Sequence, residues 1–134
     1  KGEIKISDQV SETRENKEIL IIDDENVIVD LIRTRLNSLG YNIRYSNNSK
    51  KGISLVEKNK PELIILDLML PELNGVEVIK ELKDNQNTED IKIIVLSSEQ
   101  SEEDIKHTFN LGVDDYLAKP FSLAELEDRV KRII

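Results

Sequence analysis

The 134-residue sequence contains no cysteine, no tryptophan, three prolines and five glycines, and only 4% of its residues are aromatic. Without cysteine the chain has neither disulfides nor thiolate metal ligands. It also lacks a secretory signal and any apolar run near the ~20 residues that a membrane-spanning helix requires. The sequence therefore predicts no contact with a membrane, and the cytoplasm is the expected location.

Positive charge is scarce as well, because 19 lysines and arginines stand against 27 aspartates and glutamates, a formal net charge of −8. A chain of this sign repels the phosphates of nucleic acids, so we expect no direct nucleic-acid binding by this segment. What is present, 38% apolar and 34% charged residues, is ordinary for a globular protein. The length fits one domain with one core.

The chain divides into two parts by its pattern. Residues 1–17 mix both charge signs without a period of two or 3.6, which predicts a polar linker or N-terminal arm. From residue 18 onward, short apolar runs alternate five times with amphipathic stretches. The apolar runs are residues 19–22, 41–45, 63–66, 91–96 and 113–117. Five strand–helix units predict an α/β fold in which a parallel sheet lies between layers of helices.

The second apolar run, residues 41–45, differs from the others because apolar and polar residues alternate along it. This alternation is typical of an edge strand with one wet face. It fits a doubly wound, flavodoxin-like three-layer sandwich with strand order 2-1-3-4-5. The apolar stripes predicted for the last two helices are Ile105 and Phe109, then Leu123, Leu126, Val130 and Ile133.

Polar side chains follow four of the five apolar runs. Asp23 and Asp24 end the first run, Asp67 the third and Ser97 the fourth, and Lys119 follows the fifth. Right-handed crossovers place the C-terminal ends of parallel strands along one edge, so these side chains should converge. Clustered carboxylates repel one another unless a cation compensates, and an all-oxygen ligand set favours Mg²⁺. Such a site suits phosphoryl transfer to a carboxylate nucleophile, which needs positioning and charge neutralisation.

Taken singly, each of these residues is more often a helix cap, a turn former or a solvated side chain, and the prediction depends on their combination. The combination resembles the receiver domain of two-component response regulators, over residues 18–134. The matching motifs are residues 21–25 (IIDDE), 66–71 (LDLMLP) followed by Gly75, 95–98 (VLSS) and 112–121 (GVDDYLAKPF).

The resemblance implies a role for each matching acid. Asp67 would accept a phosphoryl group from a histidine kinase or a histidine phosphotransfer protein. Mg²⁺ would be bound directly by Asp24, by Asp67 and by the backbone carbonyl of Met69, while Asp23 would act mainly through water. Met69 and Glu99 occupy the positions that tune phosphoryl lifetime in this family, so the lifetime is not predicted.

The resemblance also implies a switch. Lys119 would bind a phosphoryl oxygen, and the peptide bond that joins it to Pro120 is typically cis in this family. Ser97 would swing to another phosphoryl oxygen, and Tyr116 would rotate inward behind it. This pair would change the face built from the fourth helix, the fifth strand and the last helix, and a homodimer through this face is one option. Such a protein is not an enzyme beyond its own phosphoryl transfer and autodephosphorylation.

Three other functions fit the sequence less well. A haloacid-dehalogenase-like, Mg²⁺-dependent aspartyl-phosphate phosphatase would need a second acid two residues after Asp67, where Met69 stands. A flavodoxin-like cofactor carrier would need a loop rich in glycine and hydroxyl groups after the first strand, where three acids stand. A pseudo-receiver, which docks without being phosphorylated, would typically lack the acceptor, the lysine or the acid pair. His107 is interpreted as a solvent-facing helix residue.

The sequence starts at Lys1, and a polar arm precedes the predicted domain. We therefore expect a piece of a larger signalling protein. Its output or sensor domain would lie in the same chain or in a partner protein.

Overall fold

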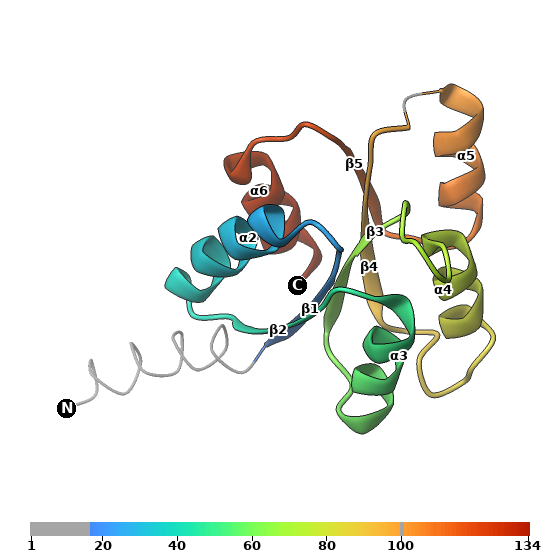
Figure 1. Ribbon diagram of the computed structural model, residues 1–134, viewed down its shortest axis with the longest axis horizontal. Helices are drawn as coiled ribbons and strands as arrows, with labels where there is room; N and C mark the ends of the chain where they lie inside the picture. The colour runs from blue at the N-terminus through green and yellow to red at the C-terminus, as the bar shows by residue number, and fades with distance from the viewer. Residues whose placement is uncertain (1–16, 100) are drawn as a thin grey trace.

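The computed structural model of the chain describes residues 17–99 and 101–134 (Figure 1). Apart from Lys17, the predicted N-terminal arm lies outside these residues. Five strands form one parallel sheet with the order β2-β1-β3-β4-β5. The strands are β1 (Glu18–Ile22), β2 (Asn42–Ser46), β3 (Leu63–Asp67), β4 (Lys92–Ser97) and β5 (Asp115–Ala118). The predicted fold class, the strand order and the edge position of the second strand are confirmed.

Helices cover both faces of the sheet, with α2 and α6 on one face and α3, α4 and α5 on the other (Figure 1). The helices are α2 (Asn26–Ser38), α3 (Ser49–Lys58), α4 (Gly75–Lys83), α5 (Glu102–Asn110) and α6 (Leu123–Ile133). Within the described ranges, no helix is long and apolar enough to cross a membrane.

The inner strands supply both cores because successive side chains point to opposite faces of a sheet. In β1, Leu20 and Ile22 pack beneath α3 and α4, while Ile19 and Ile21 pack beneath α2 and α6. All four side chains are fully buried, and each such burial stabilises the fold by about 1.5 to 3 kcal/mol. Burial on both faces explains why the inner strands read as unbroken apolar runs.

Four helices begin at a side chain that accepts a hydrogen bond from the backbone amide three residues further on. These N-caps are Asn48, Asn74, Ser101 and Ser122. Each such cap stabilises its helix by about 1 kcal/mol. Gly40 and Gly112, which lie just after α2 and α5, have positive φ angles of 98° and 99°, a conformation that a glycine adopts without strain.

The stripe predicted for the fourth helix is wrong at Phe109. Its side chain is 42% exposed, whereas the neighbouring Thr108 is buried on α5. The hydroxyl of Thr108 donates to the carbonyl of Asp104 at 2.9 Å, so this polar side chain can be buried without leaving an unpaired donor. The stripe of α6 is confirmed, because Leu126 and Val130 are buried and Leu123 and Ile133 pack partly buried beside them.

Candidate functional site

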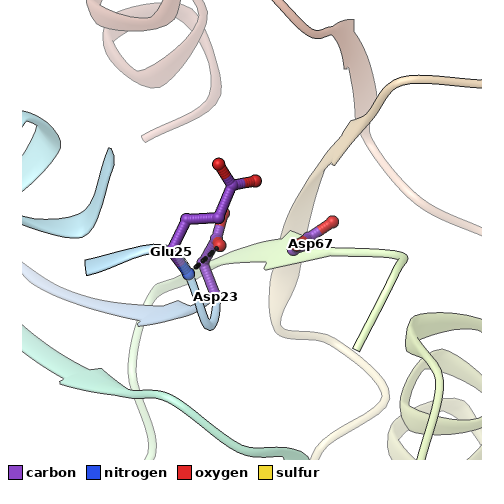
Figure 2. Close-up of side chains that lie close together, drawn as sticks. All are labelled: Asp23, Glu25 and Asp67. Carbon is purple, nitrogen blue, oxygen red and sulfur yellow. Dashed lines mark hydrogen bonds between the residues drawn. The ribbon is translucent and has the colours of Figure 1, made fainter. Parts of the chain in front are cut away.

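Three carboxylates meet at the C-terminal edge of the sheet. Figure 2 shows Asp23 and Glu25 just beyond the end of β1, and Asp67 at the end of β3. The two strands are neighbours, with Ile22 paired to Leu66, so their ends lie next to each other. One oxygen from each of the three carboxylates lies within 4.8 Å of the other two. The convergence predicted from the strand order is therefore present for Asp23 and Asp67.

Backbone amides fix the two buried carboxylates. Oδ1 of Asp23 accepts a hydrogen bond from the amide of Glu25 at 2.9 Å, and Oδ1 of Asp67 accepts one from the amide of Met69 at 3.0 Å. Asp23 is fully buried and Asp67 is 3% exposed. In each carboxylate, therefore, one oxygen is held by the main chain and the other, Oδ2, remains for the site.

Lys119 fills the space between these free oxygens. Its Nζ lies 3.2 Å from Oδ2 of Asp23, 3.5 Å from Oδ2 of Asp67 and 2.8 Å from Oε1 of Glu25. The backbone places it, because its amide donates to the carbonyl of Ser97 at 2.8 Å. The peptide bond between Lys119 and Pro120 is cis, as the resemblance implied.

The charges of this cluster are not balanced, since one ammonium group faces three carboxylates. Burial, assisted by the charge of Asp67, raises the pKa of Asp23 from 3.8 to about 6, although the amide of Glu25 and the charge of Lys119 act in the opposite direction. Burial lowers the pKa of Lys119, but the hydrogen bond to Glu25 and the charges of Asp23 and Asp67 outweigh it, so the pKa is raised. The excess of negative charge favours binding of a cation.

The residues fit a hard divalent cation. All the donors are carboxylate oxygens, the ligand type that Mg²⁺ prefers. The cluster opens into a cavity of about 640 Å³ whose wall includes Asp24, Asp67, Met69 and Lys119. A cavity of this volume is large enough for a hydrated divalent cation.

Two carboxylates of the Asp-Asp-Glu segment join the cluster, those of Asp23 and Glu25. Asp24 is exposed and lines the wall of the same cavity. That Asp24 and the carbonyl of Met69 bind the metal directly remains a prediction. Glu25 was missed as a site residue, and the available signal was that it is the third acid in a row after a buried strand.

Ser97 and Tyr116, the predicted switch pair, are joined through one residue. Ser97 is fully buried, and its Oγ accepts a hydrogen bond from the amide of Glu99 at 3.0 Å. The hydroxyl of Tyr116, also buried, donates to the carbonyl of Glu99 at 2.7 Å. A hydrogen-bonded path therefore runs from the end of β4 to β5. The movements of Ser97 and Tyr116 remain predictions, and His107 is exposed on α5 as interpreted.

The comparisons with known proteins agree with this geometry. The sequence pattern of the response regulator receiver domain matches residues 19–131. The chain is 40% identical over 119 residues to the alkaline phosphatase synthesis transcriptional regulatory protein PhoP of Bacillus subtilis, covering 89% of this chain and 49% of that protein. It is 38% identical over 118 residues to the phosphate regulon transcriptional regulatory protein PhoB of Pseudomonas aeruginosa, covering 88% and 52%.

Solved structures resemble the chain along nearly their whole length. The receiver domain of the Francisella response regulator 1452 has a TM-score of 0.83 and 33% identity, with 88% of this chain and 96% of that chain covered. A two-component response regulator from Clostridium difficile has a TM-score of 0.82 and 29% identity, with 88% and 95% covered. The chain belongs to the response regulator receiver domain family. It spans about half the length of the curated relatives it matches.

Proposed function

We propose that the chain is a phosphorylation-dependent switch in which Asp67 accepts a phosphoryl group from a phosphohistidine in a Mg²⁺-dependent reaction. The observation that carries the proposal is the environment of Asp67. One carboxylate oxygen is fixed by the amide of Met69, while the other lies 3.5 Å from the ammonium group of Lys119, on the wall of a cavity. A fixed nucleophile next to a compensating positive charge is what phosphoryl transfer to a carboxylate requires.

In the proposed step, Oδ2 of Asp67 attacks phosphorus, the P–N bond to the donor imidazole breaks, and the imidazole leaves with the electron pair of that bond. Mg²⁺, when bound, offsets the negative charge of the phosphoryl oxygens. Lys119, which pairs with three carboxylates in the unphosphorylated protein, exchanges one of these contacts for a phosphoryl oxygen. Ser97 donates its hydroxyl hydrogen to another phosphoryl oxygen.

The mouth of the cavity suits a protein donor of the phosphoryl group. Val27 and Leu31 on α2 are 72% and 52% exposed, and Met69 is 60% exposed. Leu31, Met69 and Phe121 line the cavity that contains Asp67. Exposed apolar side chains gathered around a nucleophile are typical of an interaction surface. We propose that a helical histidine kinase or histidine phosphotransfer protein docks its histidine here.

The output of the switch is proposed to be the face of α5, β5 and α6. Phosphorylation changes the charge at Asp67, and the path from Ser97 through Glu99 to Tyr116 leads from this edge to β5. We also propose that two chains form a homodimer through this face. Beyond its own phosphoryl transfer and autodephosphorylation, the chain is proposed to catalyse no reaction.

The whole protein is proposed to be a larger signalling protein. Two relatives are named transcriptional regulatory proteins, and the chain matches about half of each. In this proposal an output or sensor region, in the same chain or in a partner, responds to the switch. That the present segment does not bind nucleic acid itself, and that it works in the cytoplasm, remain predictions.

Intact-protein mass spectrometry tests the proposal. The protein is incubated with acetyl phosphate or phosphoramidate, with Mg²⁺ or with EDTA, beside an Asp67→Asn variant. One phosphoryl mass gain is expected with Mg²⁺, and none with EDTA or in the variant. If the wild type shows no gain under any condition, and beryllofluoride also fails to bind, the proposal is wrong and the chain acts as a pseudo-receiver that docks without phosphorylation.

A further inference from the structure

A buried hydroxyl group links α3 to the loop that follows Asp67. Ser49, the first residue of α3, is fully buried, and its Oγ donates a hydrogen bond to the backbone carbonyl of Leu73. Leu73 belongs to the loop of residues 68–74, here called the β3–α4 loop, which lies beside the start of α3 (Figure 1). A buried polar group usually has a partner because an unpaired one is costly, and here the partner is 24 residues away in sequence.

The β3–α4 loop forms part of the site. It starts directly after Asp67, and its residue Met69 lines the cavity at Asp67. Several residues of the loop also line an adjacent cavity of about 410 Å³. The position of the Met69 carbonyl therefore depends on the conformation of this loop.

The two ends of the loop are fixed independently of Ser49. The amide of Leu68 donates to the carbonyl of Leu96 at 3.1 Å, and the amide of Gly75 donates to the carbonyl of Leu68 at 2.9 Å. The ends also pack closely, since a Cβ atom on Gly75 would lie 2.6 Å from Cα of Leu68. Ser49 adds an attachment just before the second end, from a helix that holds none of the predicted site residues.

We infer that Ser49 is a positioning residue for the metal and phosphoryl site: by holding Leu73 it fixes the β3–α4 loop in the conformation that presents the Met69 carbonyl. This inference rests on the proposed function, because it assigns to Ser49 an effect on Mg²⁺ binding. Groups that hold metal ligands in place typically change metal affinity when they are removed.

If Ser49 had a purely structural role, its removal would lower stability without changing Mg²⁺ affinity, and Thr88 provides a matched control. Thr88 is also buried, and its Oγ1 donates to the backbone carbonyl of Leu82 at 2.6 Å. This bond joins the end of α4 to the connection that precedes β4, at the edge of the sheet opposite Asp67. Thr88→Val thus removes a comparable buried hydroxyl without touching the site, whereas Ser49→Ala removes the one that reaches the β3–α4 loop.

The test compares the wild type, Ser49→Ala and Thr88→Val. Mg²⁺ dissociation constants are measured by following backbone amide signals in NMR titrations, and amide hydrogen exchange is measured for residues 70–75. We expect Ser49→Ala to weaken Mg²⁺ binding by about tenfold and to accelerate exchange in the loop. Thr88→Val should leave both unchanged, although both variants should lose stability to urea.

Each outcome decides the inference. It is overturned if Ser49→Ala binds Mg²⁺ as tightly as the wild type, or if Thr88→Val weakens binding to the same extent. If the wild type itself binds no Mg²⁺, the proposed function and this inference both fail. The titration of the wild type separates that result from a failure of Ser49 alone.

Discussion

Replacing Asp23 with asparagine should stabilise the metal-free protein at neutral pH, although it removes an ion pair with Lys119. Burial raises the pKa of Asp23 from 3.8 to about 6, so the net effect of its surroundings is to disfavour the charged form. Asparagine has nearly the same shape and carries no charge, and its side-chain oxygen can still accept the hydrogen bond from the amide of Glu25. The variant therefore removes the cost of the buried charge and keeps the turn after β1.

The size and the pH dependence of this effect follow from linkage. At pH values below 3.8 the carboxyl group is neutral in both the folded and the unfolded chain, and it costs nothing. The cost develops as the pH rises from 3.8 and is complete above about 6. Because one pKa unit corresponds to about 1.4 kcal/mol, the full cost is roughly 3 kcal/mol. Asp23→Asn should therefore gain roughly 3 kcal/mol at about pH 7.5 and less than about 1 kcal/mol at about pH 4.

Urea unfolding followed by far-ultraviolet circular dichroism measures this gain, with EDTA present and at both pH values. Glu57→Gln, a change at an exposed position on α3, is the control and should alter stability by a few tenths of a kcal/mol at most. The reasoning is refuted if Asp23→Asn is less stable than the wild type at neutral pH, or if its gain is the same at both pH values. Added Mg²⁺ should stabilise the wild type more than the variant, because a bound metal offsets the buried charge.

Three further substitutions probe the surrounding contacts. Lys119→Met leaves the buried carboxylates without their cation and should cost about 3 to 5 kcal/mol in EDTA, with a partial recovery in Mg²⁺. Urea unfolding that shows no loss would contradict this. Gly75→Ala places a methyl group 2.6 Å from Cα of Leu68, a backbone atom, and should cost about 2 to 3 kcal/mol by the same assay. A cost below about 1 kcal/mol would mean that the loop adapts. Tyr116→Phe removes the 2.7 Å hydrogen bond to the carbonyl of Glu99 and should cost about 1 kcal/mol of stability. Asp67 should still accept a phosphoryl group in this variant. Loss of phosphorylation would contradict the role of Tyr116 as a switch residue that acts after phosphorylation.

The fold was predictable because its signals are local. Residues 63–66 are apolar on both faces and form all of β3 except its last residue, whereas residues 41–45 alternate and overlap the edge strand β2. Two features of the fold differ from what the sequence predicted. The fifth strand starts at Asp115 rather than at Val113, and Phe109 is exposed where a stripe was expected. The exposure of Phe109 depends on a neighbouring element, since packing against β5, not the period of α5 itself, decides which side chain of this short helix is buried.

The sequence predicted only those features of the site that follow from the strand order. Strand order alone brings Asp23, Asp67 and Lys119 together. The run of three acids after β1 makes Glu25 a candidate, but which of the three reaches the cluster depends on the turn after β1. The link from Ser49 to Leu73 gives no signal in the sequence, since a hydroxyl that donates to a backbone carbonyl 24 residues away follows no period.

The central claim is that the carboxylate of Asp67 becomes an acyl phosphate. Borohydride reduction tests it most directly, because hydride converts the carboxyl carbon of an aspartyl phosphate into an alcohol and leaves homoserine. After treatment with Mg²⁺ and acetyl phosphate, reduction and proteolysis, peptide mass spectrometry should find homoserine at position 67 and at no other aspartate. Homoserine at Asp23 or Asp24 instead, or none at all in a sample that carries the phosphoryl mass, would contradict the account.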